Sequence, residues 1–115
     1  MLKRKASYPA ESRENMRGGE GCVTIEKLLT PAELYEKGRM FAKITLLPGC
    51  SIGYHVHEDE MESYHILSGE AEYMEDGGGA RLFAGDTTLT LSGQGHSIKN
   101  TGDSPLEIIA LVLFK

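Results

Sequence analysis

The chain has 115 residues, of which 40% are hydrophobic and 25% are charged. This length predicts one domain, large enough to bury roughly two thirds of the surface that the unfolded chain exposes. No apolar run approaches the ~20 residues of a membrane span, and the first residues lack the apolar stretch of a secretory signal. We therefore expect a cytoplasmic protein with no membrane partner.

The charge is distributed unevenly along the chain, whose net charge is -5. Residues 1–17 hold five Lys/Arg and two Asp/Glu, whereas the remainder holds seven and fifteen. No basic recognition helix accompanies the basic segment, so we expect no nucleic-acid partner. Residues 1–21 are polar and are predicted to form an N-terminal arm that orders only against something else, such as a second subunit. Residues 22–115 are predicted to form the single domain.

Short apolar runs separated by turn residues follow one another from Cys22 onward. Turn signals every 8 to 12 residues or so are typical of an all-β sandwich or barrel. The strands that we predict are, in chain order, Val23–Leu29, Met40–Leu47, Gly53–His57, Glu62–Ser68, Ala71–Glu75, Ala80–Phe83, Thr87–Leu91, His96–Lys99 and Leu106–Phe114. Pro31–Lys37 is predicted as one short helix, because Thr30 can cap it, proline suits the first helical position and Glu33 completes a capping box.

Apolar residues of these strands supply the predicted core. Its predicted members are Met40, Phe41, Ile44, Phe83, Ile98, Ile109, Leu111 and Leu113. Cys22 and Cys50 do not form a C-x-x-C pair, and two such cysteines are interpreted as buried free thiols rather than a disulfide scaffold.

Three imidazoles and one carboxylate are predicted to form one metal site. Strand side chains alternate between faces, so His55 and His57 point to the same side of their strand. Glu62 begins the next strand, and His96 follows a glycine-rich turn much later in the chain. Such a donor set suits a first-row divalent metal. Each histidine taken alone is more often a surface or core residue, and Glu58–Glu60 is expected to be a solvated acidic loop.

Residues near Glu62 are candidates for a supporting role. Tyr64 and Ile66 share the face of Glu62 by alternation, so Tyr64 is the candidate catalytic residue, as a hydrogen-bond donor or general acid. The alternative is a half-buried tyrosine whose hydroxyl is simply satisfied. His65 faces the other way and is not expected to be a ligand. Gln94, at the mouth of the site, is interpreted as a solvent-exposed loop residue, with substrate contact as the alternative.

Residues Gly49–Gly69 and Gly85–Asn100 resemble the two sequence motifs of the cupin family. The first motif, G-x5-H-x-H-x(3,4)-E-x6-G, is matched at every fixed position. The second, G-x5-P-x-G-x2-H-x3-N, departs only at Leu91, where the family has proline and where leucine is expected to pack instead. The resemblance implies a jelly-roll barrel, or double-stranded β-helix, of six to eight strands with the metal inside near one mouth. It also implies a homodimer that pairs or exchanges N-terminal strands.

The identity of the ion governs what this site can do. On tetrahedral zinc the four residues close the shell, whereas on an octahedral ion they leave two positions open. We favour Mn or Fe, with Ni or Zn as alternatives. The predicted function is a metalloenzyme that acts on a small oxygen-containing molecule, either dioxygenase-like or a Lewis-acid isomerase or lyase. The alternative is a non-catalytic module that binds a metal or small molecule as a sensor or store.

Overall fold

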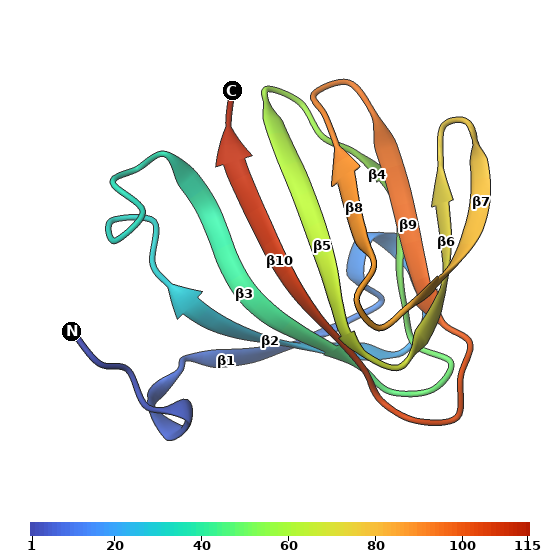
Figure 1. Cartoon of the computed structure of the whole chain (residues 1–115), viewed down its shortest axis with the longest axis horizontal. Helices are drawn as coiled ribbons and strands as arrows, with labels where there is room; N and C mark the ends of the chain where they lie inside the picture. The colour runs from blue at the N-terminus through green and yellow to red at the C-terminus, as the bar shows by residue number, and fades with distance from the viewer.

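The computed structural model describes residues 1–115 as two antiparallel sheets (Figure 1). The six-stranded sheet has the order β1 (Ala10–Glu14), β2 (Cys22–Leu29), β3 (Gly38–Leu46), β10 (Leu106–Phe114), β5 (Glu60–Ser68) and β8 (Thr87–Thr90). The four-stranded sheet has the order β4 (Ser51–Val56), β9 (Gly95–Asn100), β6 (Glu70–Glu75) and β7 (Gly78–Phe83). The predicted all-β jelly-roll fold is confirmed.

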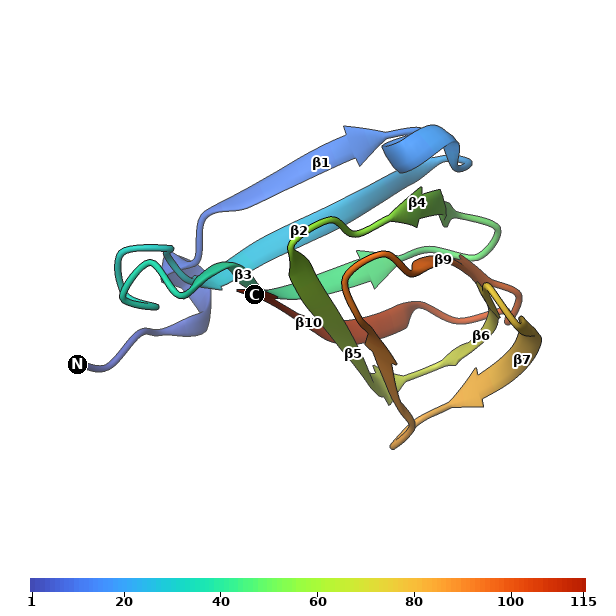
Figure 2. The same ribbon diagram turned by 90° about the horizontal axis from the view of Figure 1, so that it is seen from above.

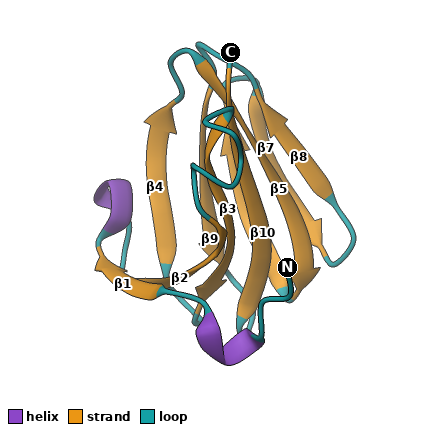
Figure 3. Ribbon diagram, turned by 90° about the vertical axis from the view of Figure 1, so that its left-hand side faces the viewer, coloured by secondary structure: helices purple, strands orange, loops and turns teal.

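The strands of the two sheets enclose a common interior, as Figure 2 shows from above. Two 3-10 turns, η1 (Lys5–Ser7) and η2 (Met16–Gly18), are the helical elements, and neither is long or apolar enough to cross a membrane. The η2 turn follows β1 and lies beside β4, outside the four-stranded sheet (Figure 3). This turn therefore lies beside the strand that carries His55.

Part of the predicted arm is a strand of its own chain's sheet. Residues Ala10–Glu14 pair antiparallel with β2, from Ala10 opposite Glu26 to Glu14 opposite Cys22. Its polar composition gave no strand signal, because both faces of this edge strand are largely exposed. Pairing of the arm with a second subunit stays a prediction.

The core lies between the sheets and alternates with exposed positions along each strand. Ile44 and Ile98 are buried as predicted. The prediction is wrong for Phe83, which is exposed while Leu82 faces inward. It is also wrong for β10, where the predicted core residues lie on the partly exposed face of the strand. The buried members of β10 are Leu106, Ile108, Ala110 and Val112. Both faces of β10 are apolar, so alternation alone did not distinguish the inner from the outer face.

The predicted helix over Pro31–Lys37 is wrong, although its start forms as expected. The backbone N–H of Thr30 donates to the Glu33 carboxylate at 2.9 Å, and the N–H of Glu33 donates to the Thr30 hydroxyl at 3.2 Å. Tyr35 and Glu36 then adopt left-handed backbone angles, with φ of 53° and 56°. A helix cannot continue through two such residues, so the segment remains a series of turns.

Fixed positions of the two motifs hold the strand ends. Gly69 has φ of 90°, and a Cβ atom there would lie 2.8 Å from the carbonyl oxygen of Pro105. The buried Asn100 side chain donates to the carbonyl oxygens of Leu46 at 2.8 Å and Ser104 at 2.9 Å. The first contact joins the end of β9 to β3 in the opposite sheet.

Leu91, which replaces the motif proline, is half exposed rather than packed. Its backbone N–H donates to the Gln94 side-chain oxygen at 2.9 Å, a bond that proline could not make. The turn before β9 is thus stabilised by hydrogen bonding in place of a rigid ring. The two cysteines are free as predicted, but Cys22, the outward-facing first residue of β2, is exposed.

Candidate metal centre

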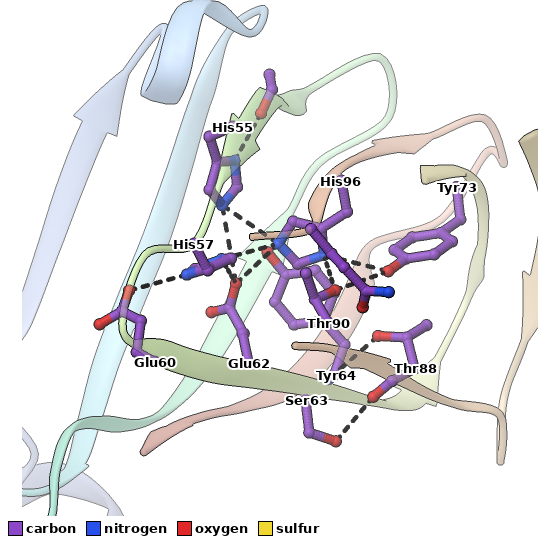
Figure 4. A network of polar contacts seen from close by, with 12 residues as sticks. His55, His57, Glu60, Glu62, Ser63, Tyr64, Tyr73, Thr88, Thr90 and His96 are labelled. Atoms are coloured by element: carbon purple, nitrogen blue, oxygen red, sulfur yellow. Dashed lines mark hydrogen bonds and ion pairs between the residues drawn. The ribbon is translucent and has the colours of Figure 1, made fainter. Parts of the chain in front are cut away.

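The four predicted ligand residues converge inside one end of the barrel (Figure 4). One donor atom from each of His55, His57, Glu62 and His96 lies within 4.8 Å of the others. His96 Nε2 lies 3.1 Å from His57 Nε2 and 3.2 Å from His55 Nε2. Such a buried cluster of three imidazoles and a carboxylate is a group that could hold a divalent metal ion.

Strand register brings the four residues together. His55 on β4 lies directly opposite His96 on the neighbouring strand β9. His57 lies just past the end of β4, where its backbone N–H donates to the Gln94 carbonyl at 3.0 Å and its carbonyl accepts from Gly93 at 2.7 Å. Glu62 reaches the cluster from β5 in the other sheet. The site therefore forms only when the two sheets pack.

Each imidazole is oriented by a second hydrogen bond at its Nδ1 atom. His55 Nδ1 is 2.8 Å from the Gly53 carbonyl oxygen, and His57 Nδ1 is 2.8 Å from Glu60 Oε1. Both partners only accept, so Nδ1 carries the proton and the Nε2 lone pair faces the cluster. His96 Nδ1 lies 2.9 Å from the hydroxyl of Thr90, within the same pattern. Partners of this kind fix ring orientation in metal sites.

These lone pairs and the Glu62 carboxylate all point at one another. Without a cation, such an arrangement of acceptors is repulsive, so the donor set fits a bound positive ion. Glu62 Oε1 lies 2.9 Å from both His57 Nε2 and His96 Nε2, but 3.8 Å from His55 Nε2. The four donor atoms are therefore close enough together for a single ion to contact them all.

The electrostatics of the cluster favour an ionised carboxylate. Burial raises the pKa of Glu62, but a doubly protonated imidazole donates its Nε2–H to this carboxylate in the metal-free protein, and these interactions with the histidines hold the pKa of Glu62 well below its ordinary value. The same interaction with Glu62 stabilises the charged imidazole and raises the pKa of His57, in opposition to burial. Glu62 is therefore ionised at neutral pH, where its oxygen can meet a cation.

Glu60 belongs to a chain of contacts behind His57. Arg39 donates to both carboxylate oxygens of Glu60 at 2.8 Å, from Nε and from its terminal nitrogen. Glu60 in turn accepts from His57 Nδ1. The hydrogen bond from Arg39 lowers the pKa of Glu60, which keeps it charged. The prediction of a solvated acidic loop is therefore wrong for Glu60, while Glu58 and Asp59 are exposed as expected.

Two tyrosines contact His96. Tyr64 is buried and stacks on the imidazole of His96, with ring centroids 4.9 Å apart and planes inclined by 13°. The Tyr73 hydroxyl lies 3.2 Å from His96 Nδ1. Burial, and then the charge of Glu62, raises the pKa of Tyr64 well above its ordinary value, so its hydroxyl stays protonated. Its role as a donor or general acid stays a prediction.

A cavity of about 20 Å³ adjoins the cluster, enough for one or two ordered waters. Its walls include His55, His57, Glu62 and Tyr64. The remaining lining residues come from the N-terminal segment and β3, and they are Arg13, Met16, Arg17, Arg39, Met40 and Ile44. Three arginines thus adjoin a cluster whose own charge is negative.

Sequence reasoning missed several of these residues. Tyr73 and Thr90 lie on strands for which side-chain alternation alone does not say which face points inward. Arg39 pairs with Glu60, which is 21 residues away in the sequence. The histidine-to-glutamate spacing of three, from His57 to Glu60, is a signal that could have found one of them. His65 is exposed, and the Gln94 side chain bonds within its own turn, which agrees with the roles expected for both.

The fold and the buried cluster define a small β-barrel with a candidate metal site, and comparison with known proteins gives its family. Residues 42–112 match the family model described as a cupin domain. An oxalate-binding protein from Thermotoga maritima is 42% identical over 113 residues, which is 98% of this chain and 93% of that protein. The chain therefore belongs to the cupin family, as the two motifs indicated.

Solved structures agree with this assignment. The crystal structure of a predicted oxalate decarboxylase from Thermotoga maritima superposes with a TM-score of 0.96 at 41% identity, covering 100% of both chains. A sugar phosphate isomerase of the cupin superfamily from Silicibacter pomeroyi gives a TM-score of 0.79 at 17% identity, covering 100% of this chain and 76% of that one. The second likeness shows the fold alone.

Proposed function

We propose that this protein binds a divalent metal ion through His55, His57, Glu62 and His96, and that the bound ion takes a small carboxylate such as oxalate. Mn or Fe is the favoured ion, because a six-coordinate ion would keep two positions open beside four protein donors. The observation that carries the proposal is the convergence of four donors beside a small cavity lined by arginines. Four protein donors on a six-coordinate ion leave two positions, the number that a chelating oxalate uses.

Charge supports an anionic ligand. Three neutral imidazoles and one carboxylate leave a divalent ion with one excess positive charge, and Arg17 adds to it, whereas Arg13 is paired with Glu11 at 3.0 Å. Arg39 is largely neutralised by Glu60. A bound divalent ion would supply Lewis-acid attraction for carboxylate oxygens. The positive surroundings therefore favour a small anion over a neutral molecule.

Size supports a ligand of few atoms. The cavity of about 20 Å³ would have to widen for any ligand larger than water, and its walls include the exposed side chains of Arg13 and Arg17. A short dicarboxylate requires a smaller shift of such side chains than a sugar does. Oxalate appears in the description of the Thermotoga maritima protein at 42% identity, an oxalate-binding protein, and in that of the Thermotoga maritima crystal structure at 41% identity, a predicted oxalate decarboxylase.

Metal analysis and calorimetry test this proposal. Purified protein would be analysed for Mn, Fe, Ni and Zn, loaded with Mn(II) and titrated with oxalate, with succinate as a longer dicarboxylate. We expect one ion per chain and saturable oxalate binding that the metal-free protein lacks. Oxalate binding that is equal with and without metal would contradict the proposal.

A second candidate is an enzyme that acts on the same ligand, and the observation in its favour is Tyr64. Its protonated hydroxyl lies on the wall of the cavity and could deliver a proton to a departing or newly formed group. The Mn- and Fe-loaded proteins would be incubated with oxalate and assayed for CO2, formate and O2 uptake. Turnover that Tyr64→Phe abolishes, with oxalate still bound, would favour the enzyme over the binding module.

A further inference from the structure

The three arginines at the cavity differ in what their side chains already bind. Arg39 is held by Glu60, and Arg13 donates to Glu11 at 3.0 Å. Arg17 forms no side-chain hydrogen bond or ion pair in the structure, although it lines the cavity beside His55 and Tyr64. Burial raises the pKa of the Tyr64 hydroxyl, and the positive charge of Arg17 acts against that rise. Arg17 is therefore the one cavity arginine whose guanidinium is free for a ligand.

The backbone of Arg17 adopts a left-handed conformation that is unfavourable for an arginine. Its φ of 55° and ψ of 30° are left-handed, a conformation that glycine or asparagine adopts at lower cost. Strain of this kind persists where the surrounding structure enforces it, and it is common at binding sites. The turn that carries Arg17 is therefore fixed by its surroundings, which gives the residue a defined position on the cavity wall.

Backbone contacts fix this strained turn against the strand of the metal cluster. A Cβ atom at Gly53 of β4 would overlap the carbonyl oxygen of Arg17, and one at Gly19 would overlap that of Ser51. The two glycines therefore let η2 lie directly on β4, as Figures 2 and 3 show. Asn15 Nδ2 closes the turn by donating to the Gly19 carbonyl at 2.9 Å. Gly53 also accepts from His55, so the anchor of η2 and the orientation of a candidate ligand share one residue.

We propose that Arg17 is the specificity-determining residue of the site, and that its guanidinium binds the oxygens of a small dicarboxylate that face away from the metal cluster. The planar fork of arginine matches two carboxylate oxygens, which a lysine ammonium does not. A monocarboxylate that places both of its oxygens toward the cluster leaves no outer oxygen, and one that uses a single oxygen leaves only one, so the two-point contact of Arg17 selects dicarboxylates over monocarboxylates. This inference rests on the proposed function, because it assigns the second half of the same ligand.

The test uses the full chain loaded with Mn(II) and titrated with oxalate and with formate by calorimetry. The variants are Arg17→Asn, whose asparagine tolerates the left-handed backbone, and Arg17→Lys, which keeps the charge. Arg81→Asn is the matched control, since Arg81 lies on β7 and pairs with Glu70 at 3.3 Å, away from the cavity. Mn(II) content and melting temperature are measured for each variant, so that loss of the ion or of the fold is recognised.

We expect Arg17→Asn to weaken oxalate binding by about 10- to 100-fold, the loss of a charge-assisted bond, while formate binding stays within about threefold. Arg17→Lys should give an intermediate loss, and Arg81→Asn should match the original protein. Unchanged oxalate affinity in Arg17→Asn, or an equal loss for oxalate and formate, would overturn the assignment of Arg17. Failure of the unmodified Mn(II) protein to bind oxalate would instead overturn the proposed function, and the inference with it.

Discussion

The two ends of the barrel interior are built from the same strands but stabilised differently. Along β5 the inward side chains run from Glu62 through Tyr64 to Ile66, and along β9 they run from His96 to Ile98. The apolar end excludes water by close packing. The polar end places a carboxylate and three imidazole lone pairs against one another, which costs stability until a cation binds. Substitutions at the apolar end should therefore change the free energy of unfolding, whereas substitutions at the polar end should change metal affinity.

The largest expected effect is removal of a candidate ligand at the polar end. His96→Ala should reduce Mn(II) affinity by more than ~100-fold. Loss of a residue that only orients a ligand lowers metal affinity by up to about 100-fold, and loss of the ligand itself should cost more. Because an ion that binds only the folded state raises its stability, added Mn(II) should raise the melting temperature of the original protein but not of the variant. His65→Ala is the control, since His65 is exposed and bonded to Thr87. Equal metal-induced shifts in both proteins would contradict the site.

The next effect is the loss of metal affinity in acid. Imidazoles bind metal in their neutral form, and the hydrogen bond to Glu62 raises the pKa of His57 above its ordinary value. Protons therefore compete with the ion from a higher pH than for a free histidine, and affinity is lost as pH falls through this pKa. We expect Mn(II) affinity to fall by at least about tenfold from pH 8 to pH 5. A constant affinity over that range would rule out ligation by three histidines.

A substitution that creates a cavity at the apolar end should lower the stability of the protein without changing its metal affinity. Ile66 is fully buried, so Ile66→Ala should lower the free energy of unfolding by about 2–5 kcal/mol. Urea denaturation of the metal-free protein measures this change. Leu67→Ala, on the exposed face of the same strand, should change it by less than about 1 kcal/mol. If Ile66→Ala lowered Mn(II) affinity as much as His96→Ala, the two ends would not be independent.

The smallest effect is expected behind the ligands, where Glu60 orients His57. Glu60→Gln keeps the shape of the side chain but removes the charge shared with Arg39, and should lower Mn(II) affinity by about tenfold, the lower end of the range for residues that orient a ligand. Glu58→Gln removes a charge from the same loop at an exposed position and is the control. An equal response of the two variants would show that Glu60 acts only through the net charge of the loop.

The sequence predicted that the four candidate ligands come together, and the structure places them in one cluster. His55 and His57 share a face by alternation, and glycines in turns such as Gly69 adopt backbone angles that few other residues accept. It did worse where both faces of an element are alike. The outer and inner faces of β10 are equally apolar, and Ala10–Glu14 is equally polar on both, so neither burial nor strand formation could be assigned from pattern.

The sequence by itself thus determined the family and the barrel and pointed to the four candidate ligands, since motif spacing and side-chain chemistry can be read along the chain. Only the tertiary structure decided which residues support the donors and face the ligand. Glu60 meets Arg39 from another strand, Thr90 meets His96 from the other sheet, and Arg17 reaches the cavity because Gly53 lets a strained turn dock. These contacts join residues distant in the chain, and they form only when the two sheets and the N-terminal segment pack together.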